Sequence, residues 1–414
     1  MLQVGIDFGT TNSVIALLDA DGSTRTAVFG TDAVFRSVLC FWAEEARASQ
    51  RLRHAAGPAA IAAYLDDPLD SRLIMSMKTY LAQRSFTETR IFGRRWSLTD
   101  LVAEFLRALT AAAGLDPAAL RVVAGRPVRF AGEVADDAFG EARLRQSFAA
   151  AGFHDVAVAL EPEGAGWRFA RSLAGPATVL VGDFGGGTSD FSLLRFTPGA
   201  PVQPLGHAGV GIAGDAFDFR IIDHVISPLL GKGDSYTIMG TDLPVPPEYF
   251  ASFARWHRVS LMRTPRTLRE IGEVARTAHH PERLRGLIAL IEDEQGFPLY
   301  QTVSAVKAAL SVTDSAVLRF AHAGIAIDEV VTRRDFESWI AGDLARIGAA
   351  VDQALARAGV PAEAVDHVFL TGGTSFVPSV RRLFEARFGA GRLTAGGEFV
   401  SVAEGLALIG ADTG

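Results

Sequence analysis

The stretch VGDFGGGTSDFSLL, from Val181 to Leu194, has a counterpart near the beginning of the chain, VGIDFGTTNSVIALL from Val4 to Leu18. In both, an apolar run leads to an aspartate, then Phe-Gly, a turn rich in glycine and threonine, and a second apolar run. Two apolar runs joined by a short glycine turn are typical of a β-hairpin. The chain therefore contains the same hairpin twice, about 176 residues apart, which predicts two related halves.

Alternating strand and helix patterns surround each hairpin, so we expect an α/β fold with helices packed on mostly parallel or mixed sheets. Residues 1–176 form the first predicted lobe. Residues 177–231 and 300–414 form the second lobe. Between them, residues 232–299 combine clustered prolines with a long arginine-rich helical pattern. This segment is predicted to be an inserted helical subdomain.

The composition limits the kinds of function that we expect. With 40 basic and 47 acidic side chains, the 414-residue chain has a formal charge of −7, which argues against binding nucleic acid or a membrane surface. Cys40 is the single cysteine, so neither an intrachain disulfide nor a cysteine-based zinc site can form. We see no signal-peptide pattern and no apolar run long enough to span a membrane. We therefore expect a cytoplasmic protein.

The turns of the two hairpins have the composition of a phosphate-binding loop. Glycine and threonine turns present several backbone N–H groups toward one point, without a Cβ in the way. An aspartate beside such a turn repels phosphate unless a divalent cation lies between them, and Mg²⁺ is usually held by one or two carboxylates together with phosphates and waters. Asp7 and Asp183 are therefore predicted to approach one Mg²⁺ from two sides, with the two turns holding a polyphosphate.

A third stretch, FLTGGTSFVPSV from Phe369 to Val380, predicts a strand, a Gly-Gly turn and a helix. The N-terminus of such a helix points toward the turn, and this arrangement allows close approach by a sugar or phosphate. We expect it to contact the nucleoside end of the ligand.

Together these motifs resemble those of a known superfamily. GIDFGTTNS, GDFGGGTSD and FLTGGTSFVP, in this order, resemble the three nucleotide motifs of the actin-like ATPases. Within that superfamily the chain is most similar to the ATPase domain of the heat-shock protein 70 family (DnaK type), with the truncated YegD-like branch as the nearest fit. VAGRPV, LEPEGAG and GVGIAGDAFDFRII also match segments of the family. The resemblance implies a two-lobed actin-like ATPase fold with duplicated ribonuclease-H-like domains, and it implies ATP or ADP and Mg²⁺ as ligands.

The resemblance also assigns roles to individual residues. It implies that Asp7 and Asp183 orient Mg²⁺ and that Lys78 positions the attacking water. The catalytic set that it implies is Lys78, Glu161, Asp183, Thr188 and Asp190. The phosphate-binding residues would be Gly9, Thr10, Thr11, Asn12, Gly185, Gly186, Gly187 and Thr188. Gly214 and Asp215 would meet the ribose or phosphates, and Lys307, Gly372, Gly373 and Ser375 the adenosine.

The chain departs from the family pattern near the predicted adenine site. Ser304 stands where the family usually has a glutamate, and Phe376 stands where an arginine commonly stacks on adenine. We expect a base site that is more apolar and less selective. The chain ends at Gly414 without a β-rich peptide-binding domain, which puts direct peptide chaperoning in doubt. The expected partners are ATP and a client or cochaperone protein.

Several other functions remain open at the level of sequence. The leading interpretation is a chaperone-type, slowly hydrolysing Mg²⁺-ATPase that acts as a nucleotide switch. A sugar or acid kinase of the same superfamily, a filament-forming scaffold, and a nucleotide sensor without turnover are the alternatives. The tripeptide Asp183–Gly185 does not indicate a protein kinase, because the other kinase motifs are missing from the sequence. The GVGIAG stretch at Gly209–Gly214 does not open a βα unit, as a dinucleotide-binding motif would.

Overall fold

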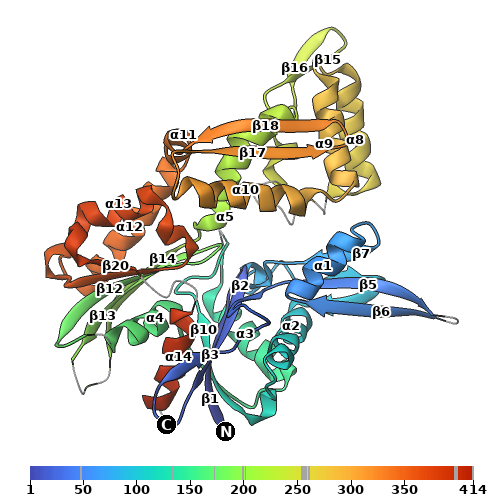
Figure 1. Cartoon of the computed structure of the whole chain (residues 1–414). Helices are drawn as coiled ribbons and strands as arrows, with labels where there is room; N and C mark the ends of the chain where they lie inside the picture. The colour runs from blue at the N-terminus through green and yellow to red at the C-terminus, as the bar shows by residue number, and fades with distance from the viewer. Residues whose placement is uncertain are drawn as a thin grey trace. The chain divides into compact units, whose positions relative to one another are not determined.

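The computed structural model describes residues 1–46, 49–132, 134–171, 173–197, 200, 202–252, 259, 262–395 and 400–412 (Figure 1). The chain divides into two compact units, of which unit 1 comprises Met1–Ala213 and Ala345–Gly414 and unit 2 comprises Gly214–Leu344. Unit 2 therefore extends beyond the predicted insertion at 232–299 on both sides. The predicted lobe bounds at residues 176 and 177 lie within unit 1 and stay a prediction.

Unit 1 contains a first sheet built around the first hairpin. Its strand order is β11-β10-β1-β2-β3. The hairpin strands β1 and β2 are antiparallel, as are β2 and β3, whereas β10 runs parallel to β1 and β11 parallel to β10. These strands are β1 (Leu2–Phe8), β2 (Asn12–Leu18), β3 (Thr24–Thr26), β10 (Leu120–Arg126) and β11 (Asp155–Leu160), and the short β4 (Phe35–Arg36) also pairs with β2.

The second sheet of unit 1 has the same topology around the second hairpin. Its order is β14-β13-β12-β19-β20, with β12, β13 and β14 antiparallel in turn and with β19 and β20 added in parallel. The strands are β12 (Ala177–Phe184), β13 (Ser189–Phe196), β14 (Gln203–Val210), β19 (His367–Thr371) and β20 (Leu393–Ala395). The prediction of two related halves is thus confirmed: each hairpin begins an antiparallel three-strand meander that two parallel strands extend.

Two helices connect the two halves of unit 1. Helix α4 (Glu161–Ala170) follows the last parallel strand of the first sheet and packs against β12 and β13 of the second. Helix α14 (Ser401–Asp412) follows the last parallel strand of the second sheet and packs against β1, β2 and β10 of the first. The two helices also pack against each other. Each half therefore contributes the helix that covers one face of the other half's sheet.

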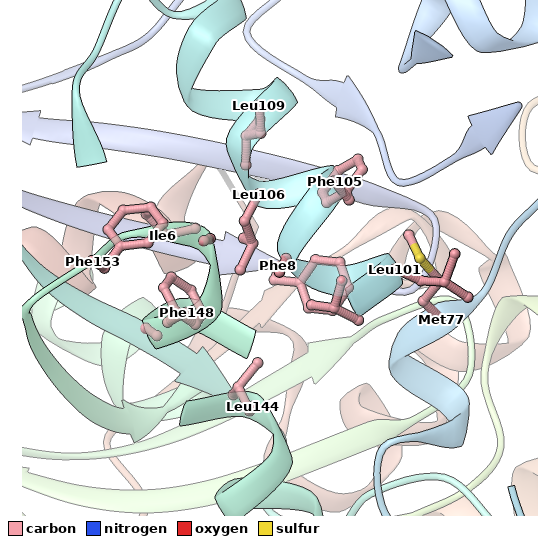
Figure 2. Packing of buried hydrophobic residues seen from close by; sticks show 14 of the residues in the cluster. Ile6, Phe8, Met77, Leu101, Phe105, Leu106, Leu109, Leu144, Phe148 and Phe153 are labelled. Atoms are coloured by element: carbon pink, nitrogen blue, oxygen red, sulfur yellow. The ribbon is translucent and has the colours of Figure 1, made fainter. Parts of the chain in front are cut away.

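The other face of the first sheet is covered by α2 (Leu98–Ala112) and α3 (Asp137–Ala151). Side chains alternate along β1, so that Ile6 and Phe8 enter the core with these helices while Gly5 faces α14. Figure 2 shows Ile6 and Phe8 together with leucine and phenylalanine side chains of α2 and α3. The N-terminus of α2 is fixed by a capping box between Ser97 and Asp100.

The remaining elements of unit 1 flank these two sheets. A separate three-stranded sheet has the order β6-β5-β7 and carries α1 beside it. The strands of this sheet and the elements that accompany them in the chain are β5 (Leu39–Ala46), β6 (Ser49–Ala56), α1 (Pro58–Asp66), β7 (Ser71–Ile74), the short helix η1 (Met77–Tyr80), β8 (Glu88–Ile91) and β9 (Arg94–Ser97). Helix α13 (Pro378–Phe388) packs instead beside the second sheet, where Phe384 contacts Phe184 and Phe191.

Unit 2 is mixed rather than purely helical, because two hairpins accompany its helices (Figure 1). Helix α10 packs against both α5 and β17, which explains why the flanking segments belong to the same unit as the predicted insertion. The elements are α5 (Gly214–Ile221), the π-helical turn Ile222–Ile226, α6 (Ser227–Leu229), β15 (Ser235–Ile238), β16 (Thr241–Pro244), α7 (Glu248–Ala251), α8 (Pro265–Thr277), α9 (Pro281–Glu292), α10 (Gly296–Leu310), β17 (Ser315–His322), β18 (Ile325–Thr332), α11 (Arg333–Trp339) and the beginning of α12 (Ala341–Ala358).

None of the helices in the described ranges is long and apolar enough to cross a membrane.

Candidate functional site

The two hairpin turns lie at corresponding ends of the two sheets. Residues 9–11 connect β1 to β2, and residues 185–188 connect β12 to β13. In the second turn the N–H of Gly185 donates to the carbonyl of Thr188 at 2.9 Å. Asp183 is paired across the hairpin with Asp190, so this hairpin places two carboxylates side by side at the base of its turn. The phosphate-binding turns predicted from the sequence are thus true β-hairpin turns.

The structure brings the two turns next to each other. A Cβ built on Gly187 of the second turn would lie 3.9 Å from Oγ1 of Thr10 in the first turn and 3.9 Å from Oγ1 of Thr79. The sequence motifs suggested this meeting of the turns, but they did not point to Thr79. Its only signal in the sequence is that it follows Lys78.

A buried ion pair joins η1 to the N-terminus of α4. Nζ of Lys78, in η1, donates a hydrogen bond to Oε1 of Glu161, the first residue of α4. The exposed fractions of the two residues are 7% and 5%. Ser76, which precedes η1, has a positive φ of 53°, an uncommon conformation for serine that redirects the chain from β7 into η1. The lysine and glutamate predicted to be catalytic therefore contact each other directly.

The aspartates of both hairpins belong to the same charged cluster. Burial, reinforced by the negative charge of Glu161, raises the pKa of Asp7 to about 7 and that of Asp190 to about 7. The same two causes raise the pKa of Asp183 well above its ordinary value. Burial alone would lower the pKa of Lys78, but the charges of Glu161 and Asp7 outweigh it and raise that pKa. Four carboxylates thus surround one ammonium group, which leaves the site with an excess of negative charge when all are ionised.

This donor set fits Mg²⁺ bound together with a polyphosphate. Across the described ranges, no three histidine, cysteine, aspartate or glutamate side chains are grouped so that they could hold a metal ion. Mg²⁺ prefers oxygen ligands and commonly takes only one or two carboxylates, with phosphates and waters completing its shell. Asp7 and Asp183 supply carboxylates of this kind at the bases of the two turns.

Asp190 is held in a fixed position by neighbouring backbone and side chains. It is 1% exposed, and its Oδ1 accepts a hydrogen bond from the N–H of Arg129 at 3.2 Å. The hydroxyl of Thr188 also bonds to this carboxylate. A Cβ on Gly209, the partner of Asp190 on β14, would lie 2.4 Å from the same oxygen. Arg129 and Gly209 were not among the predicted site residues, although Gly209 begins the GVGIAG stretch.

The third motif adjoins the second hairpin. Strand β19 runs parallel to β12, with Thr371 opposite Asp183. Gly372 has a φ of 87°, and a Cβ there would lie 2.0 Å from the carbonyl oxygen of Phe184, so only glycine fits. Ser375 is buried and donates its hydroxyl to the Gly372 carbonyl at 2.6 Å. Phe376, in contrast, is 48% exposed.

The other residues assigned to the ribose and adenosine lie in unit 2. Nζ of Lys307 donates to the carbonyl of Gly214 at 3.1 Å and to Oδ2 of the buried Asp218 at 2.8 Å. The hydroxyl of Tyr300 donates to Oδ1 of Asp215 at 3.4 Å. Gly214, Asp215 and Lys307 therefore gather at the N-terminus of α5, where the charge of the lysine is paired with Asp218. Their contact with a nucleoside stays a prediction.

Comparison with known proteins agrees with these motifs. The family model described as Hsp70 protein matches residues 293–411. The chaperone protein DnaK of Deinococcus deserti is 25% identical over 396 residues, which cover 92% of this chain and 55% of that protein. The chaperone protein HscA homolog of Pseudomonas putida is 26% identical over 417 residues, which cover 95% and 55%. A DnaK of Thermus thermophilus is 23% identical over 398 residues, which cover 93% and 57%.

The chain thus spans about half the length of the curated relatives that it matches. The similarity to these relatives nevertheless extends over nearly the whole chain, and the family match at residues 293–411 includes the third motif and implies a two-lobed actin-like fold. These matches support an ATPase domain of the Hsp70 type.

Proposed function

We propose that this domain binds ATP with Mg²⁺ and hydrolyses it slowly, as a nucleotide-driven switch of the chaperone type. The observation that carries the proposal is the buried cluster of Asp7, Lys78, Glu161, Asp183 and Asp190, which draws on both hairpins and lies beside their adjoining turns. A lone phosphate-binding turn would need no such cluster. Charged groups fixed in advance around a reacting phosphate are a principal source of catalysis in phosphoryl transfer.

Each part of the site has a role in this proposal. The backbone N–H groups of residues 9–12 and 186–188 would hold the β- and γ-phosphates, since these turns are rich in glycine and threonine and carry few bulky side chains. The N–H of Gly185 instead closes the second turn onto the Thr188 carbonyl. Asp7 and Asp183 would hold Mg²⁺, which would neutralise charge on the phosphate oxygens. Glu161 holds the ammonium of Lys78, which orients the attacking water and stabilises developing charge. Asp190, fixed by the Arg129 N–H, takes part in binding that water.

The nucleoside end is proposed to meet Gly372, Gly373 and Ser375 from unit 1. Contact of Gly214 and Asp215 with the ribose or phosphates, and of Lys307 with the adenosine, is proposed on the resemblance of the sequence alone. The exposed ring of Phe376 offers an apolar face to a base, since aromatic rings stack on every base. Together with Ser304 it supports a site with weak preference for adenine. A titration that compares ATP with other nucleoside triphosphates measures this preference.

The domain is proposed to act through a protein partner, either a client or a cochaperone, because its named relatives are chaperone proteins. Closure of the two lobes on ATP and relaxation after hydrolysis would give such a partner two states to distinguish. We also propose a cytoplasmic location and membership of the YegD-like branch. The absence of nucleic acid and membrane partners, inferred from the charge balance of the sequence, is also part of this proposal.

Release of inorganic phosphate from Mg²⁺-ATP by the purified chain tests the proposal. The wild type is expected to hydrolyse ATP slowly. Asp183→Asn should lower the hydrolysis rate by at least about 100-fold and should keep the circular-dichroism spectrum of the wild type. Asp328→Asn is the matched control, because this aspartate lies in an exposed ion pair on β18. A wild type that neither binds nor hydrolyses ATP would overturn the proposal.

The same assay separates the alternative functions. A rate that rises sharply on addition of a small hydroxylated compound would indicate a sugar or acid kinase. ATP-dependent pelleting would indicate a filament-forming protein, and tight ATP binding without phosphate release would indicate a nucleotide sensor.

A further inference from the structure

Arg143 is a buried arginine outside the predicted site. It lies on α3, is 7% exposed, and directs its guanidinium toward the chain segment that follows Lys78. Its Nη1 donates to the carbonyls of Tyr80, Leu81 and Gln83, each at 3.3 Å, and its Nη2 donates to the carbonyl of Phe86 at 3.1 Å. In the part of the chain that the structure describes, no carboxylate forms an ion pair with this guanidinium.

A buried charge without a counter-ion is costly unless hydrogen bonds replace the lost water. Arg143 meets this requirement with four backbone carbonyls, and its guanidinium also lies over the ring of Phe139 at 5.1 Å from the ring centre. Burial lowers the pKa of this guanidinium. Burying this guanidinium is energetically unfavourable, and all four of its hydrogen bonds go to carbonyls of the single segment Tyr80–Phe86.

That segment has little regular structure of its own. After η1 it continues through turns in which Leu81 N–H bonds to the Lys78 carbonyl at 3.2 Å and the Gln83 side chain bonds to the Thr79 carbonyl at 3.0 Å. The N–H of Asp136 donates to the Ala82 carbonyl at 3.1 Å. With the three bonds from Arg143, every carbonyl from Lys78 to Gln83 is hydrogen-bonded.

Met77, which begins η1 just before this segment, is held by apolar packing. Met77 is 1% exposed and lies beside Leu101 in the core, near Phe8 and Phe105 (Figure 2). Lys78 therefore extends from the short helix η1. Met77, the residue before Lys78, is fixed in the core, and the carbonyls from Tyr80 onward are fixed by hydrogen bonds from Arg143. The Lys78 side chain reaches Glu161 from this support.

The geometry points to Arg143 as a positioning residue that holds the backbone after Lys78 and so keeps the Lys78 ammonium against Glu161 at the reaction site. The expected effect of Arg143 on kcat rests on the proposed ATPase function. Its expected effect on the position of the Lys78 side chain does not. Arg143 does not touch the predicted ligands, and it acts through the segment 80–86. A misplaced catalytic group can cost about 100-fold in rate even when the ligand still binds.

Amine labelling measures the structural consequence without any nucleotide. The chain has three lysines, Lys78, Lys232 and Lys307, so trace acetylation followed by mass spectrometry gives a separate yield for each. Lys232 is an internal reference, because its side chain is 36% exposed. Arg143→Met is expected to raise the Lys78 to Lys232 labelling ratio by about fivefold or more, since loosening of the segment exposes the amine.

Two further variants complete the comparison. Arg143→Lys keeps the charge with fewer donors and should give an intermediate ratio, and it replaces Arg143→Met if that variant does not fold. Arg145→Met is the matched control, since Arg145 lies on the same helix, is 46% exposed at its side chain and pairs with Glu141. Its labelling ratio should equal that of the wild type.

Phosphate-release kinetics measure the consequence for catalysis. Arg143→Met is expected to lower kcat by about 10- to 100-fold with the affinity for ATP changed by no more than about twofold, and Arg143→Lys should restore part of kcat. A folded Arg143→Met variant with the wild-type labelling ratio would overturn the inference, as would wild-type kcat. If the wild type itself does not hydrolyse ATP, the proposed function fails, and the labelling ratio still decides whether Arg143 holds Lys78.

Discussion

Lys78 and Glu161 are each almost fully buried, so their pairing has consequences for stability as well as for chemistry. Removing one member of a buried ion pair leaves the other charge without compensation and costs about 3–5 kcal/mol. Lys78→Met should therefore lower the free energy of unfolding by about this amount in urea denaturation. Lys78→Met combined with Glu161→Gln should recover part of the loss, because the double variant no longer leaves Glu161 without its counter-ion, although Asp7, Asp183 and Asp190 stay buried nearby. It should not recover turnover. A single variant as stable as the wild type would contradict the burial of the pair.

A second residue-scale prediction concerns Glu104, on α2, and acid stability. Nε2 of His54 lies 2.8 Å from Oε1 of Glu104, and this hydrogen bond is the main cause that lowers the pKa of the glutamate to about 2 from 4.5. A carboxylate with a lowered folded-state pKa stabilises the protein above its unfolded pKa, and this contribution is lost as the pH falls. The free energy of unfolding should therefore fall more steeply in the wild type than in Glu104→Gln between pH 4.5 and about 2.

Urea denaturation at several pH values measures that difference. The stability gap between the wild type and Glu104→Gln should be widest near pH 6 and should shrink toward pH 2. A gap that stays constant across this range would show that the His54 contact does not favour the ionised glutamate.

At the scale of elements, the packing of α4 against α14 joins the two halves of unit 1. A Cβ on Gly405 of α14 would lie 1.6 Å from the carbonyl oxygen of Gly164 on α4. Gly405→Ala should force the helices apart and cost about 2 kcal/mol or more. Gly342→Ala on α12 is the control, since nothing lies within 4 Å of a Cβ there and alanine favours a helix by up to about 1 kcal/mol.

Thermal or urea unfolding of both variants tests this packing. Equal stability of Gly405→Ala and the wild type would mean that the two helices do not approach as closely as the structure indicates.

Local sequence patterns predicted some elements well and others poorly. The sequence Thr-x-x-Asp at Thr332 is typical of a helix N-terminus, and in the structure the Thr332 side chain does accept a hydrogen bond from the Asp335 N–H. The same pattern predicts one helix from there to Gly359, whereas the structure has two, α11 and α12, on either side of Ile340. Hairpin β15–β16 was also missed within the predicted helical insertion. Strands of four residues leave too short a pattern to be distinguished from a loop.

At the scale of the whole molecule, the repeated hairpin allowed the duplicated fold to be predicted, because two copies of one motif constrain two sheets. Contacts between segments far apart in the sequence could not be predicted in the same way. Arg143 bonds to carbonyls about 60 positions earlier in the chain and belongs to no motif. The resemblance assigns Lys307 to the adenosine, which stays a prediction, and the structure adds its pairing with Asp218, a contact with no local signal in the sequence.

In the proposed function, the two hairpins jointly bind one Mg²⁺ ion and one polyphosphate. At a pH above the raised pKa of about 7 of Asp7 and Asp190, their ionised carboxylates should repel ATP when no metal is present, because like charges at this depth are poorly screened. Calorimetric titration with ATP, in excess Mg²⁺ and in EDTA, tests the claim on the wild type and on Asp7→Asn combined with Asp183→Asn. The wild type should bind ATP at least about tenfold more tightly with Mg²⁺, and the double variant should lose this difference by binding metal-free ATP better. ATP affinity that does not depend on Mg²⁺ in the wild type would contradict the account.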